Sequence, residues 1–112
     1  MNDQHSILEK CRRLDSEGKT EASIALLTDS ILYSPSPAAV LLYERGWRLE
    51  EISQFDLAKN DYTQAIQIEP LAKYFIARGV LSSNKLSDHG SGLRDLQQAL
   101  KIDPRNPRAT AF

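Results

Sequence analysis

The stretch that decides the fold is AVLLYERGWRLEEISQFDLAKNDYTQAIQIEP, residues 39–70. Apolar residues recur at steps of three and four in both halves, which predicts two helices with one apolar face each. Phe55 and Asp56 separate the halves, and we expect Asp56 to be the N-cap of the second helix. Pro70 cannot continue a helix, so it ends the second one. The unit therefore reads as a pair of antiparallel helices.

The same ending occurs twice more along the chain. Pro35 lies 35 residues before Pro70 and Pro104 lies 34 residues after it, each at the close of a similar helical segment. A fixed period in this range is typical of stacked repeats, and such stacks bind partners along an extended concave surface. We predict one domain over residues 1–112, with repeats at about 4–37, 38–71 and 72–105 and a tail at 106–112.

The repeat resembles the tetratricopeptide repeat, which places large, small, aromatic and proline residues at set positions of a 34-residue unit. In the middle repeat these positions hold Leu42, Gly46, Phe55, Ala58, Tyr62, Ala65 and Pro70. The resemblance implies an all-α fold, an α-solenoid of three helix-turn-helix repeats in a right-handed superhelical stack.

Small residues have a clear packing purpose in this pattern. Gly46 and Ala58 are expected to let the two helices of one repeat approach closely, and Cys11 and Gly79 fall at the position of Gly46 in the other repeats. A glycine inside a helix costs about 1 kcal/mol relative to alanine. Because Gly90 and Gly92 in the third repeat carry this cost, we expect that repeat to be the least stable.

Composition excludes several classes of protein. The chain has 112 residues, is 41% hydrophobic and carries a formal net charge of −1, which suits a small globular domain. The weak net charge and the few basic residues near the C-terminus do not predict nucleic-acid binding. No apolar run is long enough for a membrane span, and the N-terminus lacks the features of a signal peptide. A single cysteine makes no internal disulfide, so we expect a cytoplasmic location.

Catalysis and metal binding are not predicted. His5, Cys11 and His89 are the only imidazole and thiol groups, and they lack metal-ligand spacing. We interpret Cys11 and His89 as packing residues, and we expect carboxylates such as Asp15 and Asp61 to lie on solvated helix faces. No catalytic, cofactor or metal residue is therefore assigned, and the chain is not expected to be an enzyme.

The functional hypothesis rests on the groove that the resemblance implies. In that family, partners lie in a concave channel lined by the first helix of each repeat. We call the matching residues of this chain the groove set: His5, Leu8, Arg12, Val40, Tyr43, Trp47, Glu51, Lys73, Ile76 and Val80.

Two aromatic residues of the groove set are the expected anchors. Tyr43 and Trp47 are four residues apart and so share a helix face, while Arg12, Glu51 and Lys73 would steer a partner by charge. Trp47 has a second interpretation, in which it packs between helices of adjacent repeats. The predicted function is non-catalytic binding of a peptide or helix of another protein.

An alternative function uses the end of the stack. The family closes its arrays with an extra helix, and residues 106–112 are too short for a full one. Either Phe112 folds back over the last apolar face, or another chain covers it. The protein would then be a chaperone-like or inhibitor-like subunit, or a homodimer through its C-terminal face.

One known mode of recognition is not predicted. Some members of the family hold a C-terminal carboxylate with a fixed set of lysines, asparagines and an arginine. The matching positions here are Leu8, Arg12, Glu44, Lys73 and Ala77, of which only Lys73 fits the pattern. We therefore do not expect binding of an acidic C-terminal tail.

Overall fold

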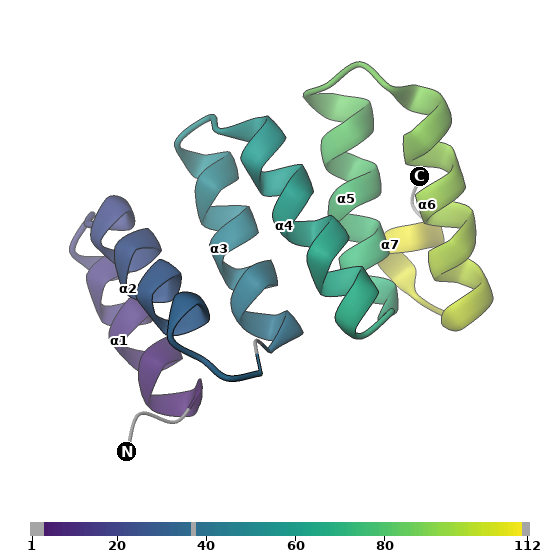
Figure 1. Ribbon diagram of the computed structural model, residues 1–112. Helices are drawn as coiled ribbons and strands as arrows, with labels where there is room; N and C mark the ends of the chain where they lie inside the picture. Colours follow the sequence, from purple (N-terminus) through teal and green to yellow (C-terminus); the bar gives the residue numbers. More distant parts are fainter. Residues whose placement is uncertain (1–3, 37, 111–112) are drawn as a thin grey trace.

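The computed structural model describes residues 4–36 and 38–110, and within them the chain is helical without strands. The helices run in order along an elongated stack (Figure 1). Their bounds are α1 (Gln4–Ser16), α2 (Thr20–Leu32), α3 (Ala39–Glu51), α4 (Phe55–Ile68), α5 (Ala72–Asn84), α6 (His89–Ile102) and α7 (Pro107–Thr110). This arrangement confirms the predicted all-α solenoid of helix-turn-helix units.

Each helix packs mainly against its neighbours in sequence, and the stack measures 39 × 26 × 22 Å. The pairs α3–α4 and α5–α6 are the most closely packed. The apolar core is divided into clusters along the stack rather than gathered at one centre. Such a core holds each helix in place through its immediate neighbours, as in other repeat proteins.

The turn inside each helix pair uses one residue in the left-handed region. These residues are Gly18 (φ 75°), Ser53 (φ 62°) and Ser87 (φ 53°), at intervals of 35 and 34 residues. The backbone N–H of Ser53 donates to the carbonyl of Glu50, and the next N–H donates to Leu49. The positive φ thus ends the first helix in each pair. Only Gly18, in the first repeat, is a glycine, the residue type that adopts a positive φ without steric cost.

Glycines permit the close helix contacts. A Cβ added at Gly46 would lie 2.5 Å from Cε1 of Tyr62, so the prediction that a small residue is needed there is confirmed. In the third repeat, a Cβ at Gly92 would lie 2.8 Å from the carbonyl oxygen of Gly79 and would also meet the hydroxyl of Ser83. Gly92 therefore permits the close contact between α5 and α6, although a glycine inside a helix lowers helix stability.

Two local predictions were wrong. The N-cap of α4 is Gln54, and Asp56 lies in the first turn of the helix. His89 is an exposed first residue of α6 rather than a packing residue, because α6 begins there. The carboxylate of Asp88 caps that helix by accepting the N–H of Ser91 at 3.1 Å. Cys11, by contrast, is fully buried as predicted.

A short helix follows the third pair. The side-chain oxygen of Asn106 accepts the N–H of Arg108 at 3.0 Å and of Ala109 at 3.3 Å, which caps α7. Ala109 is 2% exposed and packs in a cluster with Ile76, Leu96 and Ala99. Part of the last apolar face is thus covered by α7. Phe112, which we considered as a residue that folds back over this face, lies outside the described residues.

Candidate functional site

The centre of the groove set is Tyr43 on α3. Its ring centroid lies 6.0 Å from that of Tyr62 and 5.2 Å from that of Tyr74, tilted in both cases. The Nζ of Lys73 lies 5.5 Å from the centroids of both Tyr43 and Tyr74, within range of a cation–π contact. Tyr43 remains partly exposed. It is therefore an aromatic surface fixed from behind by two buried rings.

Trp47 lies one turn further along α3 and is also partly exposed. Its ring packs against the cluster that contains Leu49, Tyr62 and Leu81. The guanidinium carbon of Arg48 lies 4.0 Å from the ring centroid. Trp47 thus contacts the core while keeping some of its surface open, and its role as a groove anchor stays a prediction.

Arg48 is buried in an ion-pair network that the sequence did not indicate. Its side chain is 1% exposed, and it donates to Asp15 at 2.7 Å and to Glu44 at 2.9 Å. Asp15 also accepts the hydroxyl of Ser23 at 2.7 Å. Asp15 is thus half-buried in the network rather than simply solvated as expected. Burial opposes ionisation of Asp15, but the hydrogen bonds from Arg48 and Ser23 outweigh it and hold its pKa below the ordinary value.

A second charged arrangement links each repeat to the previous one. Arg45 donates two hydrogen bonds to Asp61, at 2.7 and 2.8 Å, and one to the hydroxyl of Thr28 at 3.3 Å. Asp61 is 2% exposed, so the expectation that it is solvated was wrong. The same arrangement recurs one repeat later. There the participants are Arg78, Asp95 and Thr63.

Glu50 differs from these carboxylates because no basic side chain of residues 4–36 and 38–110 lies within ion-pair distance of it. It is partly buried, and it accepts a hydrogen bond from the hydroxyl of Tyr62. Burial raises the pKa of Glu50 above its ordinary value, although that hydrogen bond and the more distant Lys85 and Arg108 act against the rise. Burial also raises the pKa of the Tyr62 hydroxyl, so the phenol is the donor.

The remaining members of the groove set divide by exposure. Leu8 is 9% exposed and Ile76 is 1% exposed, so both belong to the apolar core rather than to an open surface. Ile76 lies beneath Ala109 of α7. Val40 and Val80 are partly exposed. The charged or polar members, His5, Arg12, Glu51 and Lys73, are exposed.

A hollow opens beside the tyrosines, between the first turns of α3 and α5. Its volume is roughly 480 Å³, and its lining includes Val40, Lys73 and Tyr74. Two residues of the groove set therefore meet at a recessed surface.

In the part of the chain that the structure describes, no three His, Cys, Asp or Glu side chains gather as a metal site requires. No helix of residues 4–36 and 38–110 combines the length and the apolar character of a membrane span.

No protein-family model and no curated protein matches the chain, whereas many solved structures do. The second TPR domain of human RPAP3, in complex with the HSP70 peptide SGPTIEEVD, is 26% identical, with a TM-score of 0.84 over 95% of this chain and 88% of that one. The chain has the tetratricopeptide repeat fold. An Arabidopsis OM64 TPR domain is 21% identical, with a TM-score of 0.84 over 96% of this chain and 88% of that one. The second TPR of Spaghetti, bound to the HSP90 peptide SRMEEVD, is 25% identical, with a TM-score of 0.78 over 88% of this chain and 90% of that one.

The tetratricopeptide repeats of this chain differ from the carboxylate-binding pattern in their geometry as well as their residue types. Leu8 is in the core, and Glu44 brings a carboxylate that is bonded to Arg48. Ala77 has no charge, and Lys73 lies over the rings of Tyr43 and Tyr74. Arg12 is exposed but does not fit the pattern at its position.

Proposed function

We propose that this chain is a non-catalytic interaction module that binds a peptide or helix of a partner protein along α1, α3 and α5. The observation that carries this proposal is the pair Tyr43 and Trp47, two large aromatic residues one turn apart on α3 that both keep exposed surface. Tyrosine and tryptophan are enriched among residues that dominate binding energy. The fold is shared with domains that were solved with bound peptides.

The proposed anchors are held rigid before a partner arrives. Tyr43 contacts the rings of Tyr62 and Tyr74, and the Trp47 ring contacts the Arg48 guanidinium. A side chain that is already ordered loses little further conformational entropy on binding, which favours affinity. Truncation of either anchor to alanine should therefore cost more than about 2 kcal/mol of binding free energy, which is about 30-fold in Kd.

The test uses peptides selected from a random library on the wild-type protein. We expect the affinity of the selected peptides, measured by calorimetry, to fall about 30-fold or more with Tyr43→Ala or Trp47→Ala. Tyr33→Ala is the matched control, because Tyr33 is 79% exposed and lies outside the groove set. If affinity is unchanged in both folded anchor variants, this site assignment is wrong.

Selectivity provides a second test of the same proposal. The peptide SRMEEVD, which occupies the second TPR of Spaghetti, should bind this chain only weakly. Its acidic end would meet Glu44 and would lack the cations of the carboxylate-binding pattern. Binding of SRMEEVD at micromolar Kd would show that the pattern of five positions is not needed here.

A second candidate function uses the C-terminal end of the stack. Leu93 and Ile102 on α6 are 56% and 41% exposed. Large exposed apolar side chains on one helix favour association with another copy or another protein. Light scattering during gel filtration should then show a dimer that Leu93→Glu converts to a monomer. A monomer at high concentration would exclude the homodimer.

A further inference from the structure

The charges around Trp47 are unequal because the arginines of α3 are used internally. Arg45 is bonded to Asp61, and the buried Arg48 is bonded to Asp15 and Glu44. Neither guanidinium is thus free to offset charge at the surface beside Trp47. The two glutamates at the C-terminal end of α3 therefore keep their charge uncompensated by their own helix.

Those glutamates lie beside the exposed aromatic surface. Glu50 and Glu51 follow Trp47 by three and four residues, so all three side chains occupy one side of α3. Among residues 4–36 and 38–110, no basic side chain lies within ion-pair distance of Glu50 or Glu51. Lys85, a nearby cation, lies instead with its Nζ 5.7 Å from the ring centroid of Phe55.

The partial burial of Glu50 makes this arrangement unusual within the molecule. The other carboxylates with low exposure, Asp15, Glu44, Asp61 and Asp95, each have an arginine partner. Among residues 4–36 and 38–110, Glu50 has instead a hydrogen bond from the hydroxyl of Tyr62, with the cations Lys85 and Arg108 beyond ion-pair distance. A partly desolvated carboxylate without a cation is costly, and a cation supplied from outside would remove that cost.

We infer that the partner segment carries a lysine or arginine that binds beside Trp47, between the carboxylates of Glu50 and Glu51. This inference rests on the proposed function and names the chemistry of its partner. A cation there gains two ion pairs, and these ion pairs provide the attraction because the Trp47 ring already has the Arg48 guanidinium 4.0 Å from its centroid. An acidic segment would instead be repelled at this end of the groove.

The central helix also sets the spacing between the two recognised residues of the partner. Tyr43 and Glu51 are eight residues apart on α3, which is about 12 Å along the helix axis. Lys73 lies over Tyr43 at one end, and the glutamates lie at the other. The basic residue of the partner should therefore follow or precede its Tyr43-binding residue by about four positions if the segment is extended, at roughly 3.3 Å per residue.

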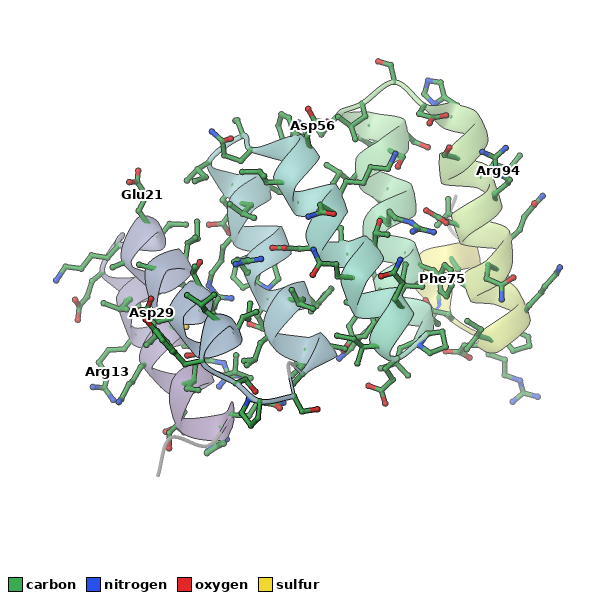
Figure 2. All side chains as sticks on the ribbon, in the orientation of Figure 1. Arg13, Glu21, Asp29, Asp56, Phe75 and Arg94 are labelled. Carbon is green, nitrogen blue, oxygen red and sulfur yellow. The ribbon has the colours of Figure 1, made fainter. Side chains whose placement is uncertain are left out.

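The experiment is a selection of random 12-residue peptides on the wild-type protein, counter-selected on Trp47→Ala. We expect the surviving peptides to share a lysine or arginine at one position. Their Kd should rise about tenfold or more with Glu51→Gln or Glu50→Gln. Glu21→Gln is the control, since Glu21 is exposed on α2, away from α3 (Figure 2).

A charge swap distinguishes a direct contact from a general field. The variant Glu51→Lys should reject the selected peptide and recover binding when the basic residue of that peptide is replaced by glutamate. Gln at position 50 can still accept the Tyr62 hydroxyl, so loss of binding in that variant is not explained by loss of that hydrogen bond.

The outcomes separate the inference from the proposed function. Trp47-dependent peptides that lack a basic residue, or that bind the Gln variants as tightly as the wild type, would overturn the inference while leaving the groove assignment intact. If all peptides taken from the wild-type selection before the counter-selection step are indifferent to both Tyr43→Ala and Trp47→Ala, the two are overturned together.

Discussion

Asp15→Ala is the substitution that most directly tests how repeat one is joined to repeat two. Asp15 accepts Arg48 Nη2 at 2.7 Å and Nε at 3.1 Å, and it also accepts Ser23 Oγ at 2.7 Å. Removing one partner of a buried ion pair typically costs 3–5 kcal/mol of stability. The loss is larger when the charge that remains is buried and has no other partner. Arg48 keeps Glu44, and the Asp15 side chain is 24% exposed. We therefore expect a loss of about 2–3 kcal/mol in the free energy of unfolding.

The partner substitution should behave differently. Arg48→Met replaces the buried arginine by an apolar side chain of similar volume, and the Asp15 left behind can reach water. We expect it to cost about 1–2 kcal/mol, and the double variant to cost less than the sum of the single ones by at least about 1 kcal/mol.

Urea unfolding followed by circular dichroism gives these free energies. Trp47 fluorescence is a second probe, because the Arg48 guanidinium lies 4.0 Å from its ring centroid. The control is Glu17→Ala, which breaks an exposed ion pair with Lys19 and should cost no more than about 0.5 kcal/mol. The reasoning is refuted if Asp15→Ala costs no more than this control, or if the two network substitutions are additive.

Three further predictions concern stability. Gly46→Ala should destabilise the fold by about 1–3 kcal/mol because the new Cβ meets the Tyr62 ring. Gly90→Ala, whose Cβ would have no neighbour nearer than 3.9 Å, should instead raise the free energy of unfolding by about 0.5–1 kcal/mol. Equal effects of the two substitutions in urea unfolding would argue against the close contact. Ser53→Gly should stabilise by about 0.5–1 kcal/mol, since φ is 62° there, and a lower thermal midpoint would contradict this. Burial raises the pKa of Glu50, so the folded state binds its proton more tightly than the unfolded state and stability falls as pH rises above the ordinary value of 4.5. Glu50→Gln should thus be more stable than wild type at pH 7, with an advantage that shrinks as pH falls through the raised pKa toward 4.5; an advantage independent of pH would show that its cause is not ionisation.

The fold was predictable because its signals are local and repeated. Pro35, Pro70 and Pro104 each follow the end of a helix by two or three residues, and each repeat shows the helical spacing of apolar residues. Boundaries that depend on a particular turn were less secure. Ser53 adopts a conformation that favours glycine, so nothing in its residue type marks the turn.

The candidate site was only partly predictable because burial depends on what the next element covers. Ile76 occupies a groove position by alignment, yet Ala109 of α7 covers it. The charged network was missed because single-sequence patterns do not show which helix faces a carboxylate. A signal was nevertheless present, since arginine, aspartate and threonine recur one repeat apart. Those residues are Arg45 with Arg78, Asp61 with Asp95, and Thr28 with Thr63.

The central claim is that a partner segment binds along the first helices of the repeats. The measurement that tests it most directly is a map of backbone amide chemical-shift changes, by nuclear magnetic resonance, when a peptide selected on the wild-type protein is added. We predict the largest changes on α3 from Tyr43 to Glu51, with further changes on α1 and α5. Changes concentrated on α2 and α4, or on the α6 surface around Leu93 and Ile102, would contradict the account.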